Sequence, residues 1–329
     1  MKIPYGISDF EKLREGNYLY IDKTRYIETL EEMGDYLFFI RPRRFGKSLF
    51  ISTLKYYYDL NQKDNFDKLF SGLYISGEPT ELKNSYFILS FNFSGMNTDS
   101  LQDLKRSFRK TVLTGLTKFL KKYQSYISKT DEIIDKLENE PDLKRMLEIV
   151  FGLVHETDRK IYVMIDEYDH FANDILAIGD NSFYKDTIRA RGFVRDFYET
   201  LKIGTESIID RIFMTGISPI MLDDLTSGFN IMTNLTTNPI LNKVLGFTQS
   251  EVEELIDEID IDLKKDILIR ELKENYNGYL FSKRGKERVY NPDMVLYFFR
   301  EWLFIGEHPD KIIDDNVKTD YGRLQRLIS

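Results

Sequence analysis

The feature that most constrains this chain is a short basic segment, RPRRFGKS, at residues 41–48. An apolar run, YLFFI, precedes it at residues 36–40, and a segment with helical character follows at residues 49–60. A strand, a tight turn that ends in Gly-Lys-Ser, and a helix is the order found in phosphate-binding loops, where backbone N–H groups and the helix dipole attract anions. The sequence therefore predicts such a loop here.

Three residues of the predicted loop have separate tasks. Gly46 lets the backbone approach a phosphate closely, Lys47 reaches the β- and γ-phosphates, and the Ser48 hydroxyl binds Mg²⁺. The usual pattern opens with a glycine five residues before Gly46, but Arg41 occupies that position. A solvated basic turn is the competing interpretation, so a second motif must decide. The predicted nucleotide-binding residues of the loop are Arg43, Arg44, Phe45, Gly46, Lys47, Ser48 and Leu49.

The second motif is KIYVMIDE at residues 160–167. Its apolar part, residues 161–165, has the length and the β-branched content of a strand buried on both faces. In nucleotide hydrolases an acid at the tip of such a strand, here Asp166, holds Mg²⁺ directly or through water. The next acid, Glu167, is placed to orient or deprotonate the attacking water. An acidic loop after a core strand is the alternative, but the two motifs together favour nucleotide binding.

Composition limits the remaining classes. The 329 residues are 42% hydrophobic and 30% charged, which is typical of a globular protein with one large core or two modest ones. The sequence has no apolar stretch near 18 residues and no apolar signal core, so neither a membrane span nor secretion is expected. Cysteine is absent, which excludes disulfides and thiolate metal sites and fits a cytoplasmic location. The net charge of −8 gives no overall signal for nucleic acid.

Two further strands and one long helix are predicted. Apolar runs at residues 86–93 and 211–215 have strand length, and Thr215 and Ser218, at the end of the second, are candidates to sense a γ-phosphate. Residues 101–126 have apolar positions at helical spacing, with a second face rich in Lys and Arg between residues 105 and 122. That basic face is either a solvated surface or a contact for an anionic partner such as nucleic acid.

Several residues outside the two motifs have candidate roles. Tyr18 and Tyr20, upstream of the loop, are candidates to stack on the base, with core packing as the alternative, and Thr24 is a candidate N-cap of the next helix. Thr248 and Glu251 form a capping-box pattern that opens a helix. One basic residue of the segment 185–203 is a candidate arginine finger across a subunit interface, which would require a homo-oligomer. The candidates are Arg189, Arg191 and Arg195.

Taken together, four segments resemble the bacterial AAA-ATPase-like family: GISDF at residues 6–10, YIDKT at 20–24, RPRRFGKS at 41–48 and IDEYD at 165–169. This family is related to the STAND-type and archaeal-ATPase branch of P-loop proteins and is commonly joined to a C-terminal PD-(D/E)xK nuclease-like domain. The resemblance implies that the missing first glycine is a family trait. The chain stops before such a nuclease domain, so no nuclease activity is expected of it.

These patterns predict an α/β P-loop NTPase fold, with a mainly parallel sheet flanked by helices (residues 1–245) and a smaller, mostly helical lid domain (residues 246–329). The expected function is ATP binding and hydrolysis with Mg²⁺, in which Ser48 and Asp166 hold the metal and Glu167 and Lys47 act on the phosphates. Two alternatives stay open: a nucleotide-binding interaction module with little turnover, and a DNA-associated ATPase that works with a nuclease. The partner, nucleic acid or protein, is not identified by the sequence.

Overall fold

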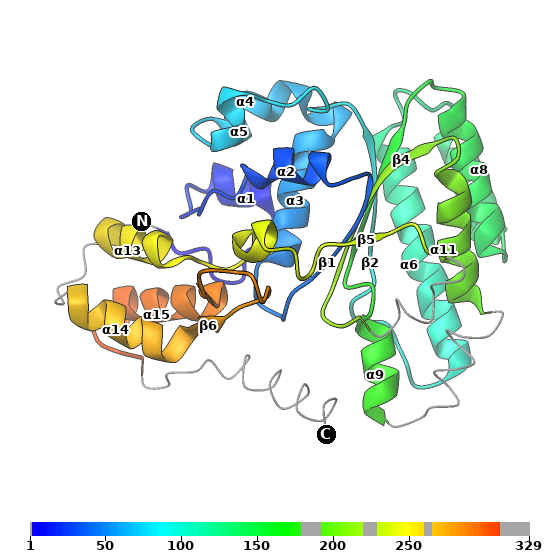
Figure 1. Ribbon diagram of the computed structural model, residues 1–329. Helices are drawn as coiled ribbons and strands as arrows, with labels where there is room; N and C mark the ends of the chain where they lie inside the picture. The colour runs from blue at the N-terminus through cyan, green and yellow to red at the C-terminus, as the bar shows by residue number, and fades with distance from the viewer. Residues whose placement is uncertain (1, 179–191, 220–228, 260–264, 310–329) are drawn as a thin grey trace.

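Five parallel strands form the central sheet, in the order β2-β3-β4-β1-β5 (Figure 1). The computed structural model describes residues 2–178, 192–219, 229–259 and 265–309. The strands are β1 (Tyr36–Ile40), β2 (Phe87–Asn92), β3 (Ile161–Asp166), β4 (Ile209–Gly216) and β5 (Thr233–Asn234). The four strands predicted from apolar runs are confirmed. The fifth, β5, was not predicted, because it consists of two polar residues and has no apolar run to reveal it.

Helices cover both faces of the sheet, as Figure 1 shows. Because successive side chains of a strand point to opposite faces, each inner strand contributes to two separate cores. In β1, Phe38 and Ile40 belong to one core, whereas Leu37 and Phe39 belong to the other. The predicted α/β class, with a mainly parallel sheet between helical layers, is confirmed.

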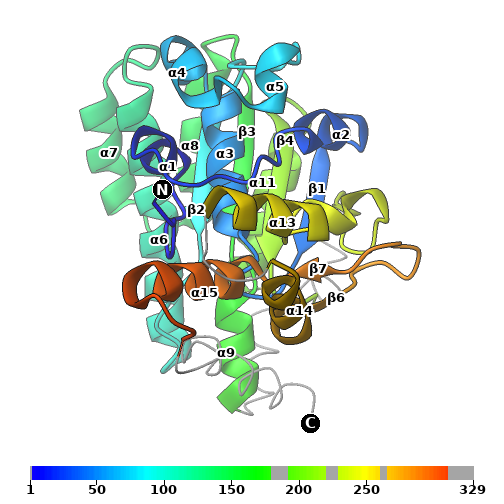
Figure 2. The ribbon, with the colours of Figure 1, turned by 90° about the vertical axis from the view of Figure 1, so that its left-hand side faces the viewer.

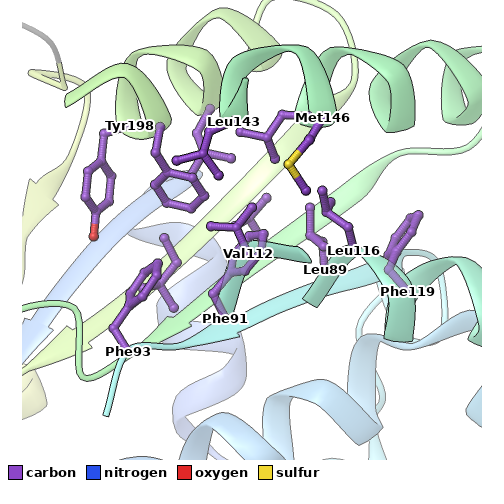
Figure 3. Close-up of a cluster of buried hydrophobic side chains, with 14 of the residues drawn as sticks. Leu89, Phe91, Phe93, Val112, Leu116, Phe119, Leu143, Met146 and Tyr198 are labelled. Carbon is purple, nitrogen blue, oxygen red and sulfur yellow. The ribbon is translucent and has the colours of Figure 1, made fainter. Parts of the chain in front are cut away.

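The first core lies between the sheet and α6 (Leu101–Lys122), α8 (Leu143–His155) and α11 (Phe193–Gly204). In Figure 3, Leu89 and Phe91 of β2, and Phe93 directly after it, point toward side chains of these helices, among them Val112 and Met146. The second core lies on the other face, against α1 (Phe10–Glu15), α2 (Tyr26–Glu32), α3 (Lys47–Tyr58) and α4 (Phe66–Phe70). Both faces of the sheet are therefore buried, and its carboxyl edge is held between two packed layers of helices.

The C-terminal part is mostly helical and has its own core, formed by α13 (Gln249–Ile259), α14 (Lys265–Tyr276) and α15 (Pro292–Ile305) (Figure 2). The capping box is confirmed: the Thr248 N–H donates to Glu251 Oε2 at 2.8 Å, and the Glu251 N–H donates to Thr248 Oγ1 at 3.3 Å. Leu19, from the N-terminal segment, packs into the same core. The two ends of the described chain therefore meet here.

The remaining elements are short connections and surface helices. They are η1 (Leu60–Asn65), α5 (Tyr74–Gly77), α7 (Thr130–Asn139), α9 (His170–Ile178), η3 (Ile240–Lys243), β6 (Asn277–Tyr279) and β7 (Val289–Tyr290). Within the residues that the structure describes, no helix combines the length and the apolar character that a membrane span requires.

Two local predictions were wrong. Thr24 does not cap α2: the N-cap position is Arg25, which makes no capping bond through its side chain. The Thr24 hydroxyl instead donates to Asp22 Oδ1 at 2.7 Å and accepts the Ile75 N–H at 3.2 Å, so it ties the N-terminal segment to α5. The long basic helix ends at Lys122 rather than near residue 126.

Candidate nucleotide site

The predicted loop connects β1 to α3 at the carboxyl edge of the sheet. Gly46 has a φ of +82° and Arg44 a φ of +66°, so the chain makes two left-handed steps before the helix begins at Lys47. A Cβ added at Gly46 would meet no protein atom within 4 Å. The glycine is therefore required in the free protein by its backbone conformation, not by a neighbouring side chain.

Lys47 is buried at the first position of α3. Its ammonium donates to the carbonyls of Arg41 and Pro42, both at 3.0 Å. Burial lowers the pKa of Lys47, while the nearby carboxylates of Asp166 and Glu167 oppose that shift. Because an ammonium has three donors, the loop holds Lys47 in place and leaves one N–H for a ligand.

Ser48 and Asp166 meet although they lie on different elements. The Ser48 hydroxyl donates to Asp166 Oδ2 at 2.6 Å, and the Thr215 hydroxyl donates to Asp166 Oδ1 at 2.8 Å. Strand β4, which carries Thr215, lies between β3 and β1 and places that hydroxyl beside the acid. Both oxygens of one buried carboxylate are thus oriented by hydroxyl groups next to the helix N-terminus.

Glu167 follows β3 in a strained conformation. Its φ of +52° lies in the left-handed region, which costs a residue other than glycine about 1–3 kcal/mol and tends to occur at functional sites. The side chain is partly exposed and lines the same cavity as Lys47 and Ser48. The sheet edge therefore presents a carboxylate to the cavity beside the phosphate-binding loop.

Ser218 belongs to a different cluster. The fully buried Asp169 accepts the N–H groups of Ile217 and Ser218, at 3.1 and 2.6 Å, and the Ser218 hydroxyl at 2.9 Å. That hydroxyl also lies 2.8 Å from Asn173 Oδ1. Gly216 makes this arrangement possible, because a Cβ there would lie 2.5 Å from Asp169 Oδ1. The Ser218 hydroxyl is thus engaged in holding the end of β4.

The cavity has a volume of about 620 Å³ and opens beside the loop. All seven loop residues from Arg43 to Leu49 line it, together with Glu167, His170 and Tyr20. Apolar side chains line its other walls, from three segments that are far apart in the sequence: residues 4–21, residues 244–247 and the start of α15. These side chains are Pro4, Ile7, Leu13, Leu19, Ile21, Val244, Leu245, Phe247, Pro292 and Leu296.

The two tyrosines upstream of the loop have different surroundings. Tyr20 lines the cavity, and its ring also packs edge-on against Phe10, with 5.4 Å between ring centroids. Tyr18 lies outside the cavity, where the ammonium of Lys2 is 5.5 Å from the centre of its ring. Of the two candidates for stacking on a base, the structure brings only Tyr20 to the site.

Arg41, which stands where the usual motif has glycine, is completely buried. Its guanidinium donates to the carbonyls of Ile40, Thr236 and Leu241 at 2.8 to 3.0 Å, and it lies 4.0 Å from the ring centres of Phe39 and Phe281. Burial lowers the pKa of Arg41 to about 9. The side chain therefore fixes the start of the loop to segments almost 200 and 240 residues away.

Other basic residues vary in their placement. The Arg44 guanidinium lies 3.7 Å from the carboxylate of Asp293, at the start of α15, so loop and C-terminal helices are in contact across the cavity. Arg195 pairs with Glu199 one turn along α11, at 2.7 Å. The other two arginine-finger candidates, Arg189 and Arg191, lie outside the described residues.

Sequence reasoning missed part of this site. His170 and Asp293 line the cavity, but neither was singled out. The position of His170 directly after the IDEYD motif was an available signal, because residues that follow the acidic strand tip share its edge of the sheet. No local pattern marks Asp293 or residues 244–247, which reach the cavity only through the packing of the C-terminal helices.

Three comparisons with known proteins gave matches. A family model described as "Predicted AAA-ATPase" (AAA-ATPase_like) matches residues 4–226. The chain is 28% identical over 320 residues to an uncharacterized protein from the vnfD 5′ region of Azotobacter chroococcum mcd 1. That match covers 95% of this chain and 55% of the relative, so the chain spans about half of the relative's length.

Among solved structures, the Walker-type ATPase PABY2304 of Pyrococcus abyssi matches with 16% identity and a TM-score of 0.48, over 93% of this chain and 72% of that one. Because the family model spans more than half of its residues, this chain belongs to the family of predicted AAA-ATPases.

Proposed function

We propose that this protein binds ATP in the cavity beside residues 41–48 and hydrolyses it with the help of Mg²⁺. The observation that carries this proposal is the contact between Ser48 and Asp166, at 2.6 Å, directly beside the buried ammonium of Lys47. A nucleoside triphosphate bound with its metal requires a hydroxyl, a carboxylate and a lysine at one helix N-terminus.

The phosphates would lie at the N-terminus of α3. The backbone N–H groups of the first turn and the helix dipole favour anions there, and Lys47 has one donor left for a phosphate oxygen. Arg43 and Arg44 add positive charge along the cavity wall. The apolar walls offer a surface for the base, which can stack on the ring of Tyr20.

Ser48 and Asp166 fit Mg²⁺, which prefers hard oxygen ligands and usually keeps several waters beside one or two protein ligands and phosphate oxygens. The donor set agrees, because it consists of one hydroxyl oxygen and one carboxylate, 2.6 Å apart. When bound, Mg²⁺ neutralises charge on the phosphates. Thr215 keeps the carboxylate of Asp166 oriented through Oδ1.

Glu167 is the proposed water-activating residue. Its carboxylate would accept a proton from water as the water oxygen bonds to the γ-phosphorus and the bond to the ADP oxygen breaks. Its strained backbone aims the side chain into the cavity instead of along the strand. Between the two candidate sensors we favour Thr215, because its hydroxyl binds the proposed metal ligand Asp166, whereas the Ser218 hydroxyl binds Asp169 and Asn173.

The test is phosphate release from ATP by the wild type and Glu167→Gln, with ATP binding measured for both. The amide keeps the shape of the carboxylate but cannot accept the proton, so we expect binding within about twofold of wild type and a loss of turnover of about 10²–10⁴-fold. Glu132→Gln, an exposed change on α7, is the matched control. Binding by both proteins with release by neither would favour the switch module with little turnover, and no binding would refute the site.

A DNA-associated role is the second candidate, and exposed lysines on α6 favour it. Lys105, Lys110, Lys118 and Lys121 are exposed, and α6 carries one acid, Asp103. Salt-dependent DNA binding by the wild type that is lost in Lys110→Glu/Lys121→Glu would establish this role. A division into residues 1–245 and 246–329, a homo-oligomer and a cytoplasmic location also remain our proposals.

A further inference from the structure

His170 lies between two carboxylates at the edge of the nucleotide cavity. Its Nε2 is 3.9 Å from Glu167 Oε2, and its Nδ1 is 3.3 Å from Asp174 Oδ2. The segment after β3 supplies Glu167, the first residue of α9 is His170, and Asp174 lies one turn further along that helix. Asp174, imidazole and Glu167 thus form a short row that ends at the proposed water-activating group.

The row faces the phosphate end of the cavity. His170 and Glu167 line it together with Arg43, Lys47 and Ser48. The charged groups that act on the imidazole are Asp174 on its own helix, Glu167 on the preceding loop and Arg43 on the phosphate-binding loop. The Asp174 carboxylate raises the pKa of His170 and Glu167 adds to this, whereas burial and Arg43 oppose it.

A role in helix stability does not explain this placement. His170 is the first residue of α9, where the helix dipole is positive and disfavours a cation. A neutral or acidic residue would suit that position better. The two carboxylates beside the imidazole, one of which lines the cavity, raise its pKa and so favour its protonated form at this end of the helix.

We propose that His170, held by Asp174, is a positioning residue for Glu167 and places a positive charge beside the γ-phosphate. The imidazole side chain orients the Glu167 carboxylate toward the attacking water. This proposal rests on the proposed ATPase function. In this proposal His170, a residue of the same chain, neutralises part of the negative charge on the transferred phosphoryl group, so this part does not require a second subunit.

The first test reads His170 directly. The chain has three histidines, His155, His170 and His308, so imidazole NMR resonances are few and His170→Gln assigns the relevant one. We expect the pKa of His170 to rise when the Mg²⁺ complex of a non-hydrolysable ATP analogue binds, and to rise less with Mg²⁺-ADP, because a γ-phosphate brings negative charge near the imidazole. Asp174→Asn should lower that pKa in the free protein.

The second test follows turnover with pH. In the wild type, kcat should fall as pH rises through the pKa of His170, and Asp174→Asn should move this fall to lower pH. His170→Gln should lower kcat about tenfold with KM nearly unchanged. This loss is smaller than that expected when a donor in direct contact with the reacting oxygen is removed. The decrease of kcat with rising pH should also disappear in this variant. His170→Lys should keep activity at higher pH, and His155→Gln, an exposed change at the end of α8, should match the wild type.

The outcomes separate the two proposals. Nucleotide binding with a pKa of His170 that is unchanged by either nucleotide would overturn the role of His170 and leave the ATPase intact. A His170→Gln protein with wild-type kcat and pH profile would do the same. Absence of nucleotide binding by calorimetry would overturn the proposed function, and the role of His170 with it.

Discussion

The Ser48 hydroxyl and the Asp166 carboxylate lie 2.6 Å apart although 118 residues separate them in the chain. The strands that carry the two motifs are not neighbours, because β4 lies between β1 and β3. Near the end of that strand lies Thr215, whose hydroxyl donates to the second oxygen of Asp166. The strand order therefore brings three oxygen groups together at the N-terminus of α3, and the first two predictions test what each contributes.

Ser48→Ala should weaken binding of ATP in the presence of Mg²⁺ and leave metal-free binding nearly unchanged. In the proposed site the hydroxyl is a metal ligand, whereas the phosphate contacts proposed for Lys47 and the loop N–H groups do not depend on it. We expect a loss of about tenfold in the presence of Mg²⁺, equal to about 1.4 kcal/mol. Calorimetric titration with and without EDTA measures the difference. Equal affinities of the wild type in both conditions would contradict a metal site at Ser48.

Thr215→Val and Ser218→Ala are a matched pair of hydroxyl deletions near the end of β4. Thr215→Val keeps the side-chain shape but leaves Asp166 Oδ1 without its donor, so we expect lower kcat and weaker dependence on Mg²⁺ concentration. Ser218→Ala removes one of several donors to Asp169 and should cost about 1 kcal/mol of folding free energy with kcat near wild type. Steady-state kinetics and urea unfolding distinguish them, and the reverse pattern would assign the sensor to Ser218.

Much of the fold could be predicted because its signals are local. The runs at residues 36–40 and 161–165 are apolar throughout, as strands covered on both faces must be, and the structure places strands there. Strand β5 was not predicted, because Thr233 and Asn234 carry no such signal. They form a strand only because they pair with Leu37 and Phe38. Thr24 looked like a helix cap, but its hydroxyl found closer partners in Asp22 and Ile75.

The cavity was predictable only in part. Residues 43–49 follow from their motif, since a loop between a strand and a helix determines its own backbone. The apolar wall at residues 244–247 and the first turn of α15 depend on how the C-terminal helices pack against Leu19 and its neighbours. The same limit applies to Arg41: its identity is visible in the sequence, but not the burial of its side chain between Phe39 and Phe281.

Arg41→Met should destabilise the protein strongly. The replacement is apolar and of similar length, but it removes the side-chain donor to the Thr236 carbonyl, one of two donors to the Leu241 carbonyl, and two ring contacts. An unsatisfied buried group costs about 1–3 kcal/mol and each buried cation–ring contact adds to this, so we expect a loss of about 3 kcal/mol in the free energy of unfolding. Arg106→Met, at an exposed position on α6, is the control and should change little. A stable Arg41→Met protein that still binds ATP would refute this structural role.

The stability of the protein should depend on pH through His170. The pKa of His170 is raised in the folded protein, chiefly by Asp174, above a value of about 6.5 for an unperturbed histidine. The folded state then holds the proton more tightly, so this contribution is fully present below about pH 6.5 and is lost as pH rises through the higher, folded pKa. His170→Gln should therefore cost more stability at acid pH than at alkaline pH. Denaturant unfolding across this range, with His155→Gln alongside, measures it, and a pH-independent difference would contradict the ion pair.

The link between the two ends of the described chain should depend on Lys23. Its ammonium lies 2.6 and 2.7 Å from the two oxygens of Glu251, which also closes the capping box of α13. Both side chains are mostly buried, so Lys23→Met leaves a carboxylate without its cation and should cost about 3 kcal/mol.

Lys23→Met/Glu251→Gln removes that uncompensated charge, and we expect it to recover part of the loss. Lys265→Met, which breaks the exposed pair with Asp257, is the matched control and should cost less than about 1 kcal/mol. Urea unfolding of the single and double variants gives the coupling energy between Lys23 and Glu251. Additive losses would show that the two side chains stabilise the protein independently, and the YIDKT motif would then need another explanation. A large coupling would mean that this motif, next to the phosphate-binding loop in the sequence, joins the N-terminal segment to the C-terminal helices that form the far wall of the cavity.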